Sequence, residues 1–152
     1  MLATLLLAPL LVATNIASAD PVVHVVRDDM GGLIGTYEAK YVSWAQRGDH
    51  VIIDGDCASA CTAMVSILSP QHVCVTPRAR FGLHLGRYSM LKWQGRDVYV
   101  DASPDIQARF NEKYYNEPHM KKWLEAHGPL TTEPQWMTFE ELSEIYQKCP
   151  GY

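Results

Sequence analysis

The sequence predicts an α/β fold with a small, mostly parallel sheet flanked by helices, and three observations predict it. Short runs rich in β-branched residues alternate with longer segments in which apolar residues recur every three or four positions. Only a few residues connect these segments, as in an α/β layer. The composition, with 47% apolar and 20% charged side chains in 152 residues, is typical of one packed globular domain.

The first half of the pattern alternates strands with helices. Strands are expected at residues 21–27, 50–53, 73–75 and 81–85, each bounded by glycine, proline or aspartate. The apolar face of a first helix comprises Ile34, Tyr37, Tyr41 and Trp44. This helix should end at Gly48, and a second should run from about Ser59 to Pro70.

The C-terminal third is more polar. Residues 87–100 predict a hairpin or an exposed arm. A helix is expected from Pro104, with a limit at Pro118. Thr138 followed by Glu141 predicts a capping box for a last helix, which the proline and glycine near the C-terminus should end.

The first 19 residues have the pattern of a secretory signal peptide. They carry no charge, their apolar run is interrupted by Pro9, and they end in the small residues Ala17, Ser18 and Ala19. Cleavage there leaves residues 20–152 as a single domain that is periplasmic or secreted. An uncleaved N-terminal anchor is the alternative. The formal net charge of −4 is scattered along the chain, which argues against a nucleic-acid partner.

All four cysteines, Cys57, Cys61, Cys74 and Cys149, follow the predicted signal peptide. An even number of cysteines in an exported chain predicts two disulfides, and three connectivities are open. A bridge from Cys57 or Cys61 to Cys74 would join a helix start to the next strand. Metal binding by Cys57 and Cys61 is the alternative, but no second Cys or His pair follows at zinc-site spacing, so neither a metal nor a cofactor is expected.

Ser59 and His84 are the candidates for chemistry. Ser59 lies between two alanines where a strand should turn into a helix, so its hydroxyl could stand exposed beside free helical N–H groups. His84 ends a later strand, and a serine nucleophile needs an imidazole within hydrogen-bond reach. Each has a simpler reading: a serine near a helix start is usually an N-cap, and a histidine after a strand need not be functional.

The order of these features resembles a known superfamily. A strand and glycine pair at residues 22–32, a glycine-led turn at 55–60, and a strand, proline and histidine at 73–84 occur in that order. Residues 22–84 thereby resemble the proteolytic subunit of the Clp protease and the wider Clp-protease/crotonase superfamily, and more closely its exported bacterial members of unknown function.

The resemblance implies a role for each matching residue. Ser59 would be the nucleophile and His84 the general base, and the backbone N–H groups of Gly32 and Ala60 would form the oxyanion hole. The third catalytic residue of the family is an aspartate, and at the corresponding place this chain has Pro134, with Glu133 the nearest carboxylate. The resemblance also begins after the first β-α-β portion of the family fold, so a truncated sheet is expected and no ATPase partner is implied.

Three functions compete at this point. The first is an exported serine hydrolase, peptidase-like, acting on a peptide or protein. The second is a non-catalytic binding module of the same fold in the cell envelope. The third, crotonase-like acyl-CoA chemistry, ranks lowest because an exported protein would not meet CoA thioesters. A nucleophilic Cys61 would need a free thiol. An exposed aromatic arm around Trp93 and Tyr99 is compatible with a homo-oligomer.

Overall fold

The computed structural model describes residues 20–152; the predicted signal peptide lies outside the described residues. A parallel sheet has the strand order β1-β2-β4-β9. Its strands are β1 (Val23–Val26), β2 (His50–Ile53), β4 (Val73–Val75) and β9 (Gln147–Lys148). Helix α1 (Ile34–Arg47) connects the first two strands and ends at Gly48, whose φ of +70° favours glycine.

A second sheet places the candidate residues. It has the order β3-β5-β8, with β3 parallel to β5 and β8 antiparallel to it. Its strands are β3 (Asp56–Ala58), β5 (Arg80–Leu83) and β8 (Gln135–Met137). The 3₁₀ helix η1 (Ser59–Ser66) follows β3 directly, and a short 3₁₀ turn η2 (Pro70–His72) precedes β4. Since β3 and β5 are parallel neighbours, the residues that follow them emerge at one edge of the sheet.

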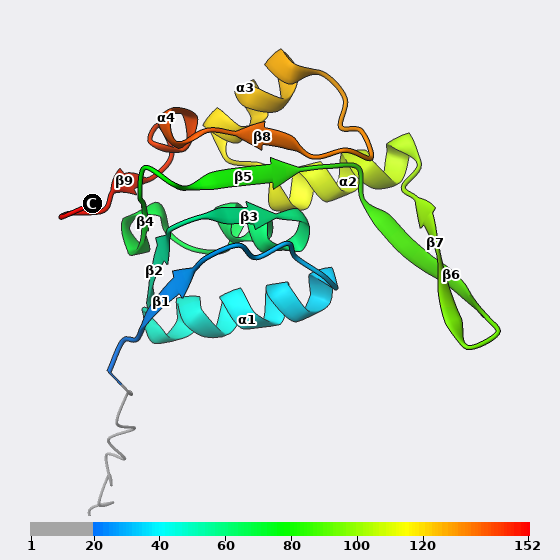
Figure 1. Ribbon diagram of the computed structural model, residues 1–152, viewed down its shortest axis with the longest axis horizontal. Coiled ribbons are helices and arrows are strands. Elements are labelled where there is room, and N and C mark those ends of the chain that lie inside the picture. The colour runs from blue at the N-terminus through cyan, green and yellow to red at the C-terminus, as the bar shows by residue number, and fades with distance from the viewer. Residues whose placement is uncertain (1–19) are drawn as a thin grey trace, which may run out of the picture.

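The remaining elements are a hairpin and three helices. Strands β6 (Arg87–Trp93) and β7 (Arg96–Asp101) form an antiparallel hairpin that projects away from the rest of the fold in Figure 1. Three helices follow: α2 (Pro104–Tyr114), α3 (Pro118–His127) and α4 (Phe139–Leu142). In the same view β3, β5 and β8 lie between α1 below and α3 above.

One hydrophobic cluster joins both sheets to the helices. Its largest fully buried side chains are Tyr41, Phe81, Ile53, Met64, Leu83, Met120, Met137 and Leu142. Helix α1 contributes Tyr41, whose hydroxyl donates to the carbonyl oxygen of Cys61 at 2.8 Å. The helix is thereby tied to η1, at the start of which Ser59 lies.

The α/β class with a small parallel sheet is confirmed, and three local predictions need correction. The segment after Ser59 is a 3₁₀ helix that ends at Ser66 rather than a helix running to Pro70. Pro118 begins α3 instead of only limiting α2, because proline fits the first helical turn. The capping box of Thr138 and Glu141 is present, but it starts a helix of only four residues.

The structure resolves the disulfide connectivity as Cys57–Cys61 and Cys74–Cys149. Neither Cys57 nor Cys61 reaches Cys74, because both belong to the β3–η1 segment whereas Cys74 lies in β4. The second bridge joins β4 to the C-terminal segment beside β9. Two disulfides are compatible with an oxidising, secreted environment. None of the helices in residues 20–152 combines the length and apolar character needed to cross a membrane.

Candidate active site

Ser59 occupies a sharp turn between a strand and a helix. It follows β3, opens η1 and has a φ of +56°. A left-handed backbone costs a non-glycine residue about 1–2 kcal/mol, so surrounding contacts must hold it in place. Ser59 does not cap η1, since the residue at the N-cap is Ala58, without a side-chain cap. The serine hydroxyl is therefore not consumed by the structural role that is usual near a helix start.

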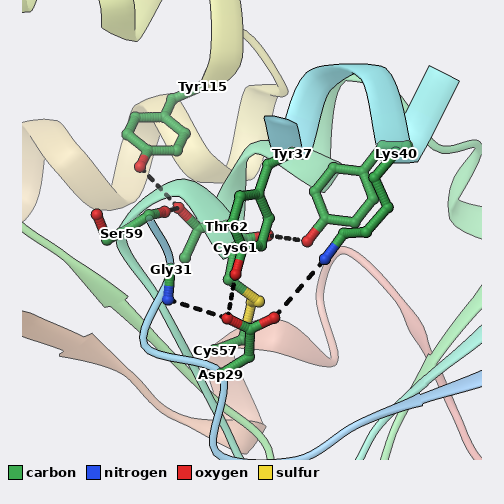
Figure 2. Close-up of a disulfide and its surroundings, with 10 residues drawn as sticks. Asp29, Gly31, Tyr37, Lys40, Cys57, Ser59, Cys61, Thr62 and Tyr115 are labelled. Carbon is green, nitrogen blue, oxygen red and sulfur yellow. Dashed lines mark hydrogen bonds and ion pairs between the residues drawn. A yellow bond between two sulfur atoms is a disulfide. The ribbon is translucent and has the colours of Figure 1, made fainter. Parts of the chain in front are cut away.

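The buried Thr62 side chain holds the carbonyl of Ser59, and the buried Tyr115 holds Thr62. Thr62 Oγ1 donates to the Ser59 oxygen at 2.7 Å and lies 2.7 Å from the hydroxyl of Tyr115. Because the single proton of Thr62 goes to the carbonyl, the Tyr115 hydroxyl is the donor in the second bond. Burial raises the pKa of Tyr115 to about 12, so its hydroxyl stays a donor well into the alkaline range. In Figure 2 the Ser59 hydroxyl points away from both Thr62 and the disulfide.

The Cys57–Cys61 disulfide closes the same turn from the other side. Cys57 belongs to β3 and Cys61 to η1, with Cα atoms 5.4 Å apart, and neither residue is accessible to solvent. The bridge thus fixes the angle at which η1 leaves the strand, with Ser59 midway between its ends. Since both thiols are oxidised, Cys61 is not available as a nucleophile.

Asp29 anchors the loop that passes beside this turn. Its Oδ1 accepts hydrogen bonds from the Gly31 amide at 2.9 Å and from the Tyr37 hydroxyl, and its Oδ2 lies 3.7 Å from Lys40 Nζ (Figure 2). Burial, together with the hydrogen bond to Asp29, raises the pKa of Tyr37 to about 12. Burial also lowers the pKa of Lys40, against the attraction of Asp29. Through these contacts α1 fixes the conformation of the loop.

Gly31 allows the loop to approach the serine turn. Its φ is +82°, and a Cβ there would lie 2.6 Å from the Ala58 oxygen and 2.7 Å from the Ser59 Cβ. No other residue type fits such a position. Since Asp29 already accepts the Gly31 N–H, the next amide available in the loop is that of Gly32. In residues 20–152 the Gly32 amide donates to no backbone oxygen in a turn, loop or cap, and the Ala60 amide belongs to the first turn of η1, where helical N–H groups lack an intrahelical partner.

His84 follows β5, and a backbone carbonyl fixes the tautomer of its neutral ring. His84 Nδ1 lies 2.7 Å from the carbonyl oxygen of Leu85. A carbonyl oxygen only accepts, so Nδ1 carries the proton in this bond and Nε2 keeps its lone pair. Nε2 is then the nitrogen that can take a proton from a serine. The ring is half-buried, as suits a group that meets a substrate.

The four residues predicted as nucleophile, base and oxyanion hole line one cavity. It encloses about 710 Å³ and contains Ser59, Ala60, Gly32 and His84 in its wall. Its apolar lining comes from the glycine loop, the hairpin and α2: Met30, Leu33, Ile34, Tyr88, Tyr99, Ala102, Ile106, Phe110 and Tyr115. Within the described residues no hydrogen bond joins Ser59 Oγ to His84, an arrangement that catalytic pairs often show before substrate binds.

Glu133 is not brought to this cavity. Its carbonyl oxygen accepts from Thr131 Oγ1 at 2.9 Å, and its side chain is exposed in the segment before β8. No hydrogen bond in residues 20–152 links the Glu133 carboxylate to His84, whose Nδ1 is already bonded to Leu85. At His84 Nδ1 the contact is made instead by a main-chain oxygen, that of Leu85.

Sequence reasoning missed the residues that hold the site. Asp29 stands two residues before Gly31, a spacing typical of an Asx-turn, and this signal could have been recognised. Thr62, three residues after Ser59, has the spacing of a local side-chain to backbone bond. Tyr115 comes from the end of α2, more than forty residues later, and no local sequence pattern predicts its contact with Thr62.

Two comparisons with known proteins found no match for the chain. No protein-family model matches it, and no curated protein matches it. The described residues also hold no group of three His, Cys, Asp or Glu side chains that could bind a metal ion.

Proposed function

We propose that the chain is an exported serine hydrolase, peptidase-like, in which Ser59 is the nucleophile and His84 the general base. The observation that carries the proposal is the left-handed turn at Ser59, which lies in the wall of the same cavity as His84; among residues 20–152 no side chain bonds to the Ser59 hydroxyl. A strained serine between a strand and a helix is the arrangement of a nucleophile elbow. Export is supported by the two disulfides.

The residues of the cavity suit each step of acyl transfer. Ser59 Oγ would bond to the acyl carbon of an ester or peptide while its proton passes to His84 Nε2. The negative charge on the former carbonyl oxygen would be stabilised by the amides of Gly32 and Ala60. His84 would then return the proton to the leaving amine or alcohol, and a water molecule would release the acyl group by the same route in reverse.

A carbonyl in place of the usual carboxylate retains part of the triad's function. In serine proteases, changing the aspartate to asparagine costs about 10⁴ in rate because the histidine is held in the wrong tautomer. Here Leu85 holds the tautomer that leaves Nε2 unprotonated. The orienting role is therefore kept, whereas the stabilisation of the imidazolium by a full negative charge is not, and we expect a slow enzyme.

The apolar lining of the cavity points to the acyl part of the substrate. Leu33 and Tyr99 are 72% and 54% exposed at its wall, and Ile106 and Phe110 are half-buried there. Such a surface would accept an apolar side chain or acyl group with little desolvation cost. The same surface favours the alternative of a non-catalytic binding module, which needs the cavity but not the serine.

Labelling with a fluorophosphonate probe tests the proposal. Attack by Ser59 Oγ forms an O–P bond and expels fluoride, with the serine proton passing to His84, so the folded wild type should be labelled and Ser59→Ala should not. Ser89→Ala is the matched control, because Ser89 lines the same cavity and should not react. Equal labelling of wild type and Ser59→Ala would refute the assignment. A folded wild type that is never labelled would favour the binding module.

A further inference from the structure

Gln107 is a buried polar residue that the proposed mechanism does not use. It is 7% exposed, lies in α2 and lines the cavity that holds Ser59 and His84. Its Oε1 accepts a hydrogen bond from the Gly86 amide at 2.8 Å, and its Nε2 donates to Asn111 Oδ1 at 2.6 Å. Both ends of the side-chain amide are therefore bonded, and the donor on Gly86 fixes which end is the oxygen.

The Gly86 amide and the Leu85 carbonyl belong to one peptide unit. On its oxygen this unit accepts the hydrogen bond from His84 Nδ1, and on its nitrogen it donates to Gln107. Hydrogen bonds arranged in such a chain polarise one another, by about 10–30% per bond. A donor bond to Gln107 therefore makes the Leu85 oxygen a stronger acceptor for His84.

The surrounding chain keeps this peptide unit in place. The Leu85 amide donates to the Thr131 oxygen at 2.6 Å, and the Ala102 amide donates to the Gly86 oxygen at 2.7 Å. A Cβ on Gly86 would lie 3.3 Å from Gln107 Oε1, so glycine allows the close approach of α2. The unit cannot rotate without breaking several bonds at once.

We propose that Gln107 is a positioning residue for His84, which it orients and polarises through the Leu85–Gly86 peptide. These two hydrogen bonds, from Gly86 to Gln107 and from His84 to Leu85, take the place of the single carboxylate that orients the base in a serine triad. When His84 takes the proton of Ser59, the positive imidazolium meets a carbonyl oxygen whose negative partial charge the Gln107 bond increases. The catalytic meaning of this chain rests on the proposed function, whereas the coupling between Gln107 and His84 does not.

Two near-isosteric substitutions of Gln107 should shift the pH midpoint of the His84 titration in opposite directions. Gln107→Glu keeps an acceptor for Gly86 and adds a negative charge, so the imidazolium is stabilised and the pH midpoint of His84 rises. Gln107→Met removes the acceptor and should lower that midpoint, because the Leu85 carbonyl is then less polarised. Asn111 can turn its amide to donate to the new carboxylate, so the glutamate variant should fold. Asn111→Ala, which frees the far end of Gln107, should have a smaller effect of the same sign as Gln107→Met.

The titration of the His84 ring, followed by NMR in the full chain, is the measurement. Ala108→Glu is the matched control, since it adds the same charge at an exposed position next to Gln107 on α2. Arg87, Tyr88, Tyr99 and Tyr115 also line the cavity but are unchanged in all variants. Opposite shifts in the two Gln107 variants, with little change in the control, would support the inference. Equal midpoints in wild type and both Gln107 variants would overturn it.

Labelling rates separate this inference from the proposed function. If Ser59 is the nucleophile, Gln107→Met should react about tenfold more slowly with the fluorophosphonate probe at neutral pH, the effect of losing one ordinary hydrogen bond. Gln107→Glu should retain most of the wild-type rate. If the wild type is labelled but the Gln107 variants have the same labelling rates and His84 midpoints as the wild type, the hydrolase proposal is supported and the role of Gln107 is refuted. If the wild type is not labelled but the two variants shift the His84 midpoint in opposite directions, the coupling is supported and the hydrolase proposal is refuted.

Discussion

The two disulfides constrain very different lengths of the chain. Cys57 and Cys61 are four residues apart and enclose the turn that carries Ser59, whereas Cys74 and Cys149 are 75 residues apart and tie β4 to the C-terminal segment. In the chain-entropy treatment, a bridge limits the unfolded chain more the longer the loop it closes. The long bridge should therefore contribute more to the free energy of unfolding than the short one.

The short bridge, which closes the smaller loop, has the more closely packed surroundings. The short bridge is fully buried beside a residue with a left-handed backbone, and Tyr41, Thr62 and Tyr115 donate hydrogen bonds within the same turn. The long bridge supports β9, a strand of two residues that pairs only with β4. The short bridge therefore constrains the turn at Ser59, and the long bridge constrains the packing of the C-terminal segment against β4.

Removing the long bridge should give the largest loss of stability. For Cys74→Ala/Cys149→Ala the entropy model gives about 4.5 kcal/mol, because the closed loop is long. Denaturant unfolding at 25 °C measures the change. The rate of fluorophosphonate labelling per folded molecule should stay within about twofold of wild type, since neither Cys74 nor Cys149 is among the residues that line the cavity. A large loss of labelling in a variant that remains folded would show that the two regions are not separate.

Removing the short bridge should cost less stability and more reactivity. Cys57→Ala/Cys61→Ala should lose about 2 kcal/mol, because the loop is short and alanine suits both buried positions. The labelling rate should fall by about tenfold or more, since a misplaced nucleophile loses the benefit of orientation. The Cys74→Ala/Cys149→Ala variant is its matched control. If both variants label equally well, the short bridge has no role in positioning Ser59.

The strands and helices of the scaffold could be predicted from the sequence more fully than the residues that position the candidate site. The short β-branched runs predicted β1, β2 and β4, and the apolar run at residues 81–85 predicted β5, which pairs with β3 and β8 in the second sheet. Helix α3 was missed because Pro118 was interpreted only as a stop, although proline also suits a helix start. The strand β9 could not be predicted, since two polar residues become a strand only by pairing with β4.

The candidate site was predicted only where chain order implies proximity. Ser59 and His84 each follow a strand, and parallel strands bring such residues to one edge, so a shared cavity could be expected. The partner of His84 Nδ1 could not be predicted, because every residue has a main-chain oxygen and the sequence does not show which one a side chain will meet. Gln107 was equally hidden, since its role depends on how closely α2 approaches Gly86.

The smallest expected effect is on the pH dependence of the free energy of unfolding, and it concerns the scaffold alone. The Asp54 carboxylate, at the end of β2, is inaccessible to solvent and accepts hydrogen bonds from Arg78, Arg27 and Thr76. These bonds, that of Arg78 foremost, hold the pKa of Asp54 well below its ordinary value. The unfolded chain then binds more protons than the folded chain as the pH falls through the range between the two pKa values.

The contribution of Asp54 should therefore be complete above about pH 4, the ordinary range of an aspartate, and be lost progressively below it. Asp54→Asn removes the charge, so its stability at pH 7 should be lower and its decline below pH 4 shallower than that of wild type. Part of the decline should remain, because the Arg47 guanidinium, with the Val22 amide, lowers the pKa of Asp49 in the same way. Denaturant unfolding between pH 2.5 and 7 measures both curves. Parallel curves for the two proteins would mean that Asp54 does not carry the acid sensitivity, whereas a change in labelling per folded molecule would show that the charge network reaches the serine turn.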